Sequence, residues 1–367
     1  MIKNKVSPFL RELASPQFTL ICIGLSMLIV IGGTLAQVKL GVLGAQKIFF
    51  DSFLVFWSPS SSLKIPIFPG GLTIGVLWLV SLGASFFYRF KYTSKDVGMI
   101  LTHVGIVVLL IGQLLTQTLS REAHVSMSLG QTRNFIESKD LELAVVMTSD
   151  PTSDHVTSVP YSVFSRGRTV SAPALPFSLK VLNFYTNARL LKMGAGWIPE
   201  ELPPETGDSE SNSPVAHVEL FDGSQSLGSW FVSSSPDEPQ QVSFQGQTYQ
   251  LIIRPKRIYL PYTLTLKDFR HEVYPGTNIP KSFSSLIHLD DPGRNESRDI
   301  LIYMNHPWRY GGRAFYQASY GDNDTTSILQ VVKNPVWMTP YVSSGLMALG
   351  LLLQFSLHLI GFMRKPS

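Results

Sequence analysis

The chain has 367 residues, of which 44% are hydrophobic and only 15% are charged. The low charge and the clustering of apolar residues exclude an ordinary soluble protein. The single cysteine, Cys22, excludes a thiol–disulfide carrier with a Cys-x-x-Cys pair and a c-type cytochrome with Cys-x-x-Cys-His. The sequence contains no phosphate-binding loop, nucleophile elbow, His-Glu-x-x-His helix or basic nucleic-acid patch, so we expect no nucleic-acid partner and assign no catalytic residue.

Four segments are long and apolar enough to cross a bilayer, which requires about 17 to 25 mostly apolar residues. The first is interpreted as a retained helix, because no convincing cleavage site for a signal peptide precedes Lys39. Between the first two segments, residues 46–57 are rich in aromatic residues at helical spacing, which predicts a helix lying in the membrane interface. The four predicted spans are residues 18–37, 72–88, 97–118 and 340–363.

From about Arg121 the apolar period changes to two, which predicts an all-β domain of the sandwich or open-barrel type. The acidic, Pro-rich residues 199–214 predict a mobile surface loop. The predicted fold is therefore a bundle of four transmembrane helices plus a large external, sandwich-like β domain. The strand-like runs are residues 124–127, 141–148, 177–184, 216–221, 230–233, 248–253, 262–269, 283–289, 300–304, 314–319 and 327–332.

The charges divide unevenly among the three predicted regions, which are a membrane unit at 1–118, a β domain at 119–338 and a fourth span with a tail at 339–367. The β domain carries 19 Lys and Arg against 23 Asp and Glu, whereas the rest of the chain carries 11 against three. The positive-inside rule therefore predicts that both termini are cytoplasmic and that the β domain lies outside the cytoplasm.

His103 lies inside the otherwise apolar third span. An ionisable side chain is expensive in hydrocarbon and by default marks a pathway, a proton relay or a cofactor ligand. Neutral imidazole binds metals, so a buried iron is a natural partner. A histidine hydrogen-bonded to a neighbouring helix, or one reaching the interface, remains an open alternative. A second face carries small residues that would let another helix approach closely: Gly98, Thr102, Gly105, Gly112 and Thr116.

A second histidine, His358, lies in the fourth span, six residues before Arg364. Because the third and fourth spans run antiparallel, His103 and His358 are expected near the same cytoplasmic depth. The two histidines either serve one site or pair with different groups, and His358 is also close enough to a helix end to reach water.

The order of three helices, an external β domain and one further helix resembles the ResB (CcsB) family of cytochrome c biogenesis proteins. The resemblance covers the architecture of the whole chain, and its most specific parts are the two late motifs. Two features depart from the family pattern, because the Gly-Thr-x-x-Pro-Gln motif lacks its proline and the outer domain is compact. The stretches that carry the resemblance are Gly33-Thr-Leu-Ala-Gln37, His103-Val-Gly-Ile, Pro280-Lys-Ser-Phe-Ser-Ser285 and Asn305-His-Pro-Trp-Arg-Tyr-Gly-Gly-Arg-Ala-Phe-Tyr-Gln-Ala-Ser-Tyr320.

The resemblance implies a subunit of a system II haem delivery and cytochrome c synthase complex in a bacterial inner membrane. Its partners would be a CcsA (ResC) membrane protein, the Cys-x-x-Cys-His motif of an apocytochrome c and thiol-reducing proteins. Haem b would be a transient cargo, with His103 as one axial ligand of its iron and CcsA supplying the other. The partner's Trp-rich motif is missing here, so the chain would be a non-catalytic or co-catalytic subunit.

Arg309 and Arg313 in the last motif are candidates for contacts with haem propionates or an acidic partner surface. Gly311 and Gly312 predict a turn between two strands, and Tyr316 and Tyr320 are expected on one face. The alternative is a purely structural hairpin. For the whole chain, two other functions stay open. One is a non-catalytic scaffold of a membrane redox complex, and the other is a haem b electron-transfer subunit that uses both His103 and His358.

Overall fold

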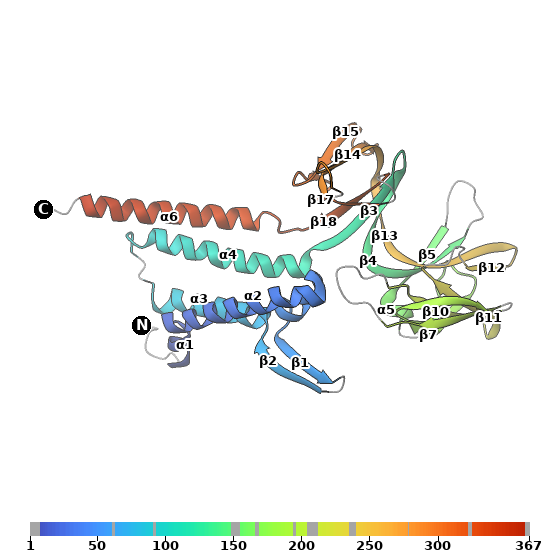
Figure 1. Cartoon of the computed structure of the whole chain (residues 1–367), viewed down its shortest axis with the longest axis horizontal. Coiled ribbons are helices and arrows are strands. Elements are labelled where there is room, and N and C mark those ends of the chain that lie inside the picture. Colours follow the sequence, from blue (N-terminus) through green and yellow to red (C-terminus); the bar gives the residue numbers. More distant parts are fainter. Residues whose placement is uncertain are drawn as a thin grey trace. The chain divides into compact units, whose positions relative to one another are not determined.

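The computed structural model describes residues 8–60, 63–90, 93–147, 155–165, 169–193, 196–203, 212–234, 240–277, 279–321 and 325–363. The chain forms two compact units. The described helical unit lies within residues 8–120 and 335–363, and the described β domain lies within residues 121–334 (Figure 1).

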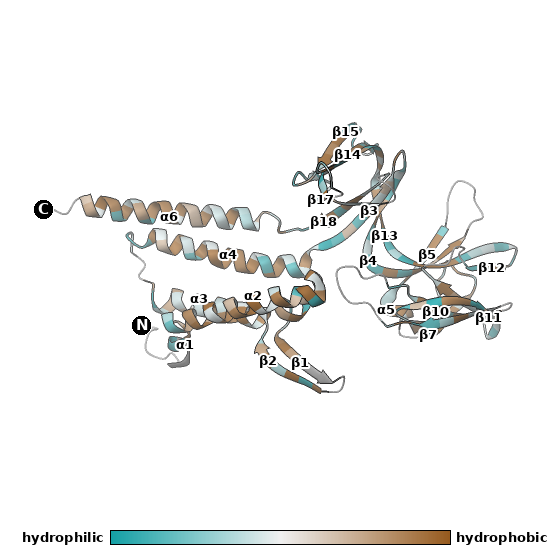
Figure 2. Ribbon diagram, in the orientation of Figure 1, coloured by the Kyte–Doolittle hydropathy of each residue, from teal (hydrophilic) through white to brown (hydrophobic). Residues whose placement is uncertain are grey.

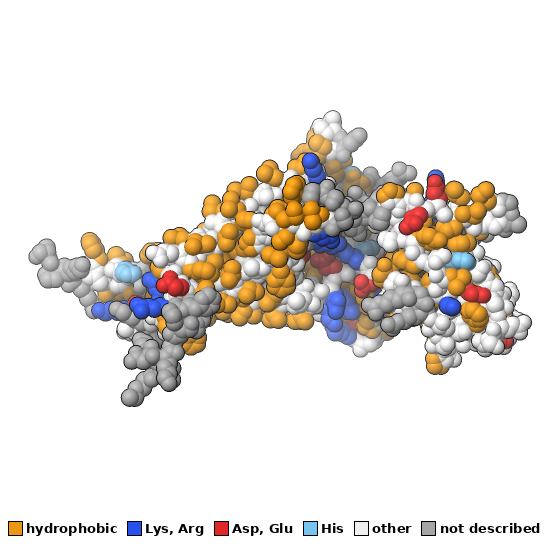
Figure 3. Space-filling view, turned by 90° about the horizontal axis from the view of Figure 1, so that it is seen from below, with side chains coloured by type: hydrophobic (Ala, Val, Ile, Leu, Met, Phe, Trp, Pro, Cys, Tyr) orange, Lys and Arg blue, Asp and Glu red, His pale blue; other side chains and the backbone are white. Residues whose placement is uncertain are grey.

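Within the described residues, four helices are long and apolar enough to cross a membrane, which confirms the predicted spans. Hydrophobic residues run along these helices (Figure 2), and a space-filling view shows a largely apolar surface with charges at the end where the chain termini lie (Figure 3). A short helix, α1, packs against α3. The helices are α1 (Pro8–Leu13), α2 (Pro16–Ala45), α3 (Gly71–Tyr88), α4 (Val97–Leu119) and α6 (Thr339–Met363).

The helix α2 is kinked at Gly41, whose φ of 69° is one that glycine adopts without strain. A π-helical turn, η1 (Gln46–Phe50), then packs back against α2. A Cβ atom at Gly33 would lie 2.7 Å from the ring of Phe50, so only glycine lets this ring approach so closely. The first stretch of the family resemblance therefore has a structural reason.

The predicted interfacial helix at 46–57 is wrong beyond Phe50. The chain instead forms a hairpin of β1 (Leu54–Ser60) and β2 (Leu63–Pro69), in which Trp57 lies opposite Ile65. The aromatic and aliphatic residues that suggested a helical face suit a strand equally well, and β2 supplies the backbone partner. The base of the hairpin is closed by a 2.8 Å hydrogen bond from the Gly70 amide to the carbonyl of Phe53.

The small-residue face of α4 packs against α6, as the sequence predicts. Gly98, Gly105 and Gly112 are the buried residues of α4. A Cβ at Gly98 would lie 2.5 Å from the backbone nitrogen of Gln354, and one at Gly105 would lie 2.6 Å from the side chain of Met347. The two helices therefore run antiparallel with their backbones in close approach.

The β domain is built on one large sheet, which among the described residues has ten strands in the order β15-β14-β13-β4-β3-β18-β17-β16, with β12 on β13 and β5 on β4. A second, four-stranded sheet has the order β11-β10-β7-β6. The strands are β3 (Arg121–Ser128), β4 (Thr132–Met147), β5 (His155–Pro160), β6 (Thr169–Val170), β7 (Ser178–Tyr185), β8 (Ala188–Met193), β9 (Gly196–Glu201), β10 (Val215–Asp222), β11 (Gln225–Ser233), β12 (Gln240–Phe244), β13 (Gln247–Val273), β14 (Pro280–Asp291), β15 (Glu296–Tyr303), β16 (Trp308–Tyr310), β17 (Arg313–Gly321) and β18 (Thr326–Lys333).

Two hydrophobic cores lie along the large sheet. The first is enclosed where the sheet curls, because the outer strand β15 also contacts β16 and β17, and it is centred on Phe315, Leu264 and Leu289. The second lies between β4, β13 and the four-stranded sheet, as in a sandwich, and includes Phe164 of a short helix, α5 (Tyr161–Phe164), together with Leu251. The predicted sandwich-like β fold is thus confirmed, and β4 and β13 contribute to both cores.

Each predicted strand-like run falls in a strand, but the boundaries differ. The runs 248–253 and 262–269 are parts of one strand, β13, which continues through Pro255 and Pro261. The register of β13 against β4 shifts beside Pro255 and again around Pro261. Because the regular pairing is already interrupted at these shifts, the missing amide hydrogen of each proline removes no regular ladder bond. Residues 199–201 of the predicted loop pair in β9, and residues 204–211 lie outside the described part of the chain.

Candidate functional site

A cavity of about 470 Å³ lies in the helical unit, between α2, α3 and α4. Its volume falls in the range of about 300–1,000 Å³ that is typical of small-molecule sites. Most of the walls are apolar, and a few polar groups interrupt them, which is also typical of such sites. The lining residues are Ala14, Thr19, Cys22, Ile23, Trp78, Ser81, Leu82, Ser85, Arg89, Phe90, Met99, His103 and Ile106.

His103 lines this cavity from α4 and is half-buried. Its Nδ1 lies 2.8 Å from the carbonyl oxygen of Met99, and its ring meets the edge of Phe90 at 4.9 Å between centroids. A carbonyl only accepts, so Nδ1 carries the proton in this contact and the neutral ring keeps its lone pair at Nε2. This is the arrangement that orients a metal-binding histidine.

The polar groups of the cavity come mainly from α3. The Thr19 and Ser81 hydroxyl oxygens lie 3.2 Å apart, and Nη1 of Arg89 donates a long, 3.4 Å hydrogen bond to the carbonyl of Ala14. Nε1 of Trp78 is buried and has no hydrogen-bond partner within the described residues. A buried donor without an acceptor is unfavourable, so a bound molecule with an acceptor atom would stabilise this wall.

His358 is exposed on α6 and is not one of the described residues that line the cavity. Its Nδ1 lies 3.0 Å from the carbonyl of Gln354, one turn earlier on the helix. The side chain of Gln354 in turn accepts a 3.0 Å hydrogen bond from the amide of Met99. The two histidines therefore lie near one end of the helical unit, but the structure does not bring them together in the cavity.

The two late motifs of the β domain meet in a buried polar network. Ser285 of β14 contacts Gln317 of β17 and Ser327 of β18, each through oxygen atoms 2.6 Å apart, and Gln317 donates a 3.2 Å bond to Ser327. The rings of Phe283 and Tyr320 pack beside this network, 5.8 Å apart. Because β14 and β17 are not ladder neighbours, these motif residues hold the curled sheet closed.

Tyr310 makes a second set of contacts between the two ends of the curled sheet. Its hydroxyl oxygen lies 2.7 Å from a carboxylate oxygen of Asp291 and 2.9 Å from one of Glu296, and its single proton is available to either, so it ties β16 to β14 and β15. Burial, reinforced by these two carboxylates, raises the pKa of Tyr310 above its ordinary value. The predicted turn is confirmed, since Gly311 and Gly312 join β16 to β17 with φ values of 56° and 72°.

The hairpin separates the two arginines of the last motif. Arg309 pairs with Ala314, and Tyr310 pairs with Arg313, so the arginine side chains lie on opposite faces. Arg313 lies beside Tyr262, where its charge acts against the burial that raises the pKa of Tyr262. The expectation that Tyr316 and Tyr320 share a face is wrong, because a bulge after Gln317 reverses the alternation.

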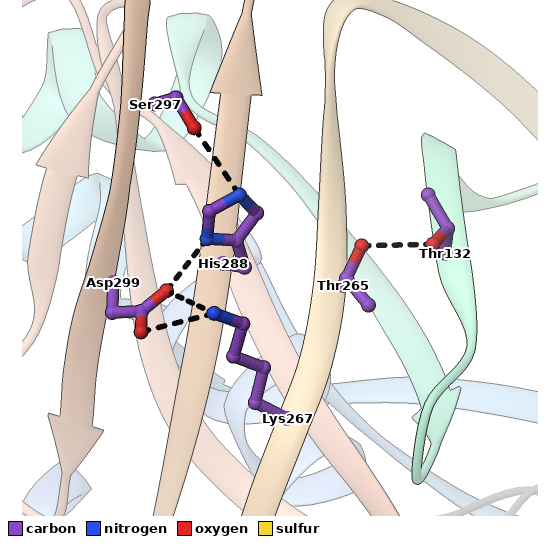
Figure 4. Close-up of polar contacts among 6 residues, drawn as sticks. All are labelled: Thr132, Thr265, Lys267, His288, Ser297 and Asp299. Atoms are coloured by element: carbon purple, nitrogen blue, oxygen red, sulfur yellow. Dashed lines mark hydrogen bonds and ion pairs between the residues drawn. The ribbon is translucent and has the colours of Figure 1, made fainter.

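In a polar cluster on β13, β14 and β15, an aspartate, a histidine and a serine are in contact in that order, as in the triad of a serine hydrolase (Figure 4). Nδ1 of His288 lies 2.6 Å from Asp299, and Nε2 lies 3.3 Å from the hydroxyl of Ser297. The Lys267 ammonium also pairs with Asp299 at 2.9 Å, and these contacts lower the pKa of that carboxyl, Lys267 first and His288 second. His288, Ser297 and Asp299 lie on the paired strands β14 and β15, with His288 and Asp299 partly exposed to solvent. We interpret the cluster as a surface ion-pair network.

The structure is that of a membrane protein with four apolar helices, a cavity among three of them and a large β domain. Residues 238–333 match the ResB-like family, which confirms the resemblance found in the sequence. This stretch runs from β12 to β18 and contains both late motifs and the network that closes the sheet. The match therefore falls on the part of the β domain whose contacts explain those motifs.

Two individual proteins are also similar to the chain. Protein NrfI of Wolinella succinogenes is 25% identical over 268 residues, which are 72% of this chain and 27% of NrfI, so the chain spans about a quarter of that relative. The solved structure titled Cytochrome c Heme Lyase CcmF is 10% identical with a TM-score of 0.22, over 77% of this chain and 30% of that one. This TM-score establishes no shared fold.

Proposed function

We propose that the chain is a ResB-like subunit of a system II cytochrome c synthase complex, which helps to bind haem in the membrane and to deliver it to apocytochromes. The observation that carries the proposal is the cavity among the apolar helices, with His103 in its wall. Three kinds of support converge on it: the ResB-like match, the apolar helices around the cavity and the orientation of the imidazole.

The residues of the cavity fit haem as a cargo. Apolar side chains such as Ile23, Leu82 and Ile106 would cover the porphyrin faces, and Nε2 of His103 would bind the iron. The reactivity that forms thioethers resides in haem b and the client cysteines, while this chain binds and orients.

The second axial ligand is proposed to come from a CcsA (ResC) partner, because the described part of the cavity wall holds one histidine. Apocytochrome c would be received by the β domain outside the cytoplasm, with thiol-reducing proteins keeping its cysteines reduced. We place both termini on the cytoplasmic side of a bacterial inner membrane. This placement is supported by Arg11, Arg89 and Lys95, which lie at the end of the helical unit where α3 ends and α4 begins.

The alternative of a bis-histidine haem b subunit requires His103 and His358 at one site. Because His358 is exposed and His103 lines the cavity, the structure offers no single pocket that contains both among the described residues. Arg309 and Arg313 remain proposed contacts of haem or of an acidic partner surface. Their opposite faces mean that they would serve two different contacts.

The test is to purify the full chain with its CcsA-type partner and to record reduced-minus-oxidised haem spectra. We expect His103→Ala to lower the haem content at least about tenfold, since even changes beside a metal ligand cost about 10- to 100-fold in affinity. His358→Ala is the matched control and should leave the spectrum unchanged. His103→Gly with added imidazole should restore haem if the ring is a ligand rather than a packing element.

Two results would count against the proposal. An unchanged haem content in His103→Ala would remove His103 as the ligand. The scaffold function would be favoured instead by two results together. The wild-type complex would contain no haem in any preparation, and deletion of the chain would leave the maturation of c-type cytochromes normal.

A further inference from the structure

The wall of the cavity is electrostatically one-sided. Arg89 is its one permanent charge among the described lining residues, and it lies immediately after the end of α3. The guanidinium has five N–H donors, yet its one hydrogen bond in the described structure is the 3.4 Å contact with Ala14. Because Arg89 is an exposed residue that also lines the cavity, most of its donors can reach an anion at this edge of the cavity.

The opposite end of the cavity is apolar except for the buried Nε1 of Trp78. Trp78 lies eleven residues before Arg89 on the same helix, which at 1.5 Å per residue is about 16 Å along its axis. Trp78 packs with the apolar cluster of Ile29, Val55 and Ile74, whereas His103 lies at the Arg89 end, beside Phe90. The site thus has a cation at one end, an imidazole next to it and an apolar far end.

We propose that Arg89 binds the carboxylate edge of the tetrapyrrole cargo and so fixes the direction in which the cargo enters. This inference rests on the proposed haem-binding function and adds the orientation. Charge-assisted hydrogen bonds from a guanidinium to a carboxylate are the strongest available in such a site. With the propionates at Arg89, the edge of the ring without carboxylates points along α3 toward Trp78.

A simpler role for Arg89 is to complement the carbonyl end of α3, where a cation is favourable. That role would stabilise the helix regardless of what occupies the cavity. The two roles differ in one respect, because only a carboxylate contact discriminates between cargo molecules with and without carboxylates. A lipid phosphate could supply the same anionic chemistry, so the membrane used in the test must lack anionic lipids.

The experiment uses the full chain with its CcsA-type partner in phosphatidylcholine nanodiscs. Haemin and haemin dimethyl ester, which share the iron and the ring but differ in the carboxylates, are titrated and followed by the Soret band. We expect the wild type to bind the diacid about 10- to 100-fold more tightly than the ester, as one charged hydrogen bond provides. Arg89→Gln should abolish this ratio and leave the affinity for the ester unchanged.

The controls separate the possible causes. Arg89→Lys keeps the charge and should retain part of the preference for the diacid over the ester. It also replaces Arg89→Gln as the test variant if Arg89→Gln does not fold. Arg11→Gln removes another cation at the same end of the helical unit and should change nothing. His103→Ala should weaken the binding of haemin and of its dimethyl ester by the same factor.

Each remaining outcome decides the question. Equal affinity of the wild type for both molecules, or an equal weakening of both by Arg89→Gln, would overturn the role of Arg89 while leaving haem binding intact. A thermal stabilisation of the wild type by added phosphatidylglycerol that Arg89→Gln abolishes, with no preference between the two haemins in phosphatidylcholine, would assign Arg89 to a lipid headgroup and overturn the inference. Failure of the wild type to bind either molecule would overturn the proposed function, and this inference with it.

Discussion

In the helical unit the packed pair α4 and α6 buries glycine and serine, whereas the β domain buries large hydrophobic side chains. The buried residues of α4 are Gly98, Gly105 and Gly112, and those of α6 are Ser343 and Gly350. In the β domain the largest fully buried side chains include phenylalanine, leucine and isoleucine. At the same time α6 exposes large apolar side chains, with Phe355 70% exposed.

This difference follows from the surroundings of each unit. In water, burying apolar area drives folding, so the core is where the large side chains are. In a bilayer the lipid is as apolar as leucine, so helices associate through close packing and short interhelical contacts, which small residues permit. An apolar face therefore predicts the core in one unit and the lipid-facing surface in the other.

The largest effect on stability is expected from a substitution that creates a cavity in the core of the β domain. Phe315 is fully buried in the first core, so Phe315→Ala should lower the free energy of unfolding of the β domain by about 3–5 kcal/mol. The measurement is denaturant unfolding of the full chain in detergent, followed by tryptophan fluorescence. Leu301→Ala, at a side chain 53% exposed on β15, is the control and should stay within about 0.5 kcal/mol. Equal effects of the two variants would contradict the proposed core.

In the helical unit the comparison predicts that stability is lost when side-chain atoms are added, rather than when they are removed. Gly98→Leu places side-chain atoms where a Cβ alone would lie 2.5 Å from backbone atoms of both Gly350 and Gln354. We expect α4 and α6 to separate, with a loss of about 1–3 kcal/mol or more. Thermal unfolding with detection by gel filtration measures it. Gly345→Leu, with open space at its Cβ, should be tolerated, and tolerance of both would refute the close packing.

The smallest effect concerns a surface interaction of the β domain. Contacts with Lys267 and His288 lower the pKa of Asp299. A carboxyl with a lowered folded-state pKa stabilises the fold above its unfolded value of about 3.9, and the stabilisation is lost as the pH falls through the lower folded value. Asp299→Asn should therefore reduce stability slightly at pH 7 and make no difference in strong acid. Unfolding curves at several pH values test this, with the exposed Asp222→Asn as control, and a loss that persists in acid would contradict it.

The sequence predicted the parts of the fold that depend on local periodicity. The apolar spans, the glycine face of α4 and the strand runs follow from spacing alone, and the Gly311–Gly312 turn follows from its residue types. The β1–β2 hairpin was missed because its aromatic residues also fit a helical face, and only the pairing with β2 decides between them. The continuity of β13 was missed because Pro255 suggests a break, which the register shift against β4 accommodates.

The candidate site was predicted in part. His103 was identified because an ionisable residue in an apolar helix is conspicuous, but Arg89 was only one of the 11 basic residues counted outside the β domain, and Trp78 was not singled out. Both enter the site because α2, α3 and α4 come together, which no local pattern specifies. Their signal in the sequence was weak, since an arginine at the end of a span is ordinary. The network of Ser285, Gln317 and Ser327 likewise depends on the closure of the sheet.

The 27-residue strand β13 has a mechanical consequence for the β domain. Its first half contributes Leu251 and Ile253 to one core, and its second half contributes Leu264 and Leu266 to the other. Local opening in proteins proceeds in cooperative units bounded by supersecondary elements, and here the two cores share one backbone. Loss of packing in either core weakens the backbone hydrogen bonds between β13 and β4, which both cores share. The domain is therefore expected to open as a single foldon, with no seam along which a protease could release one half intact.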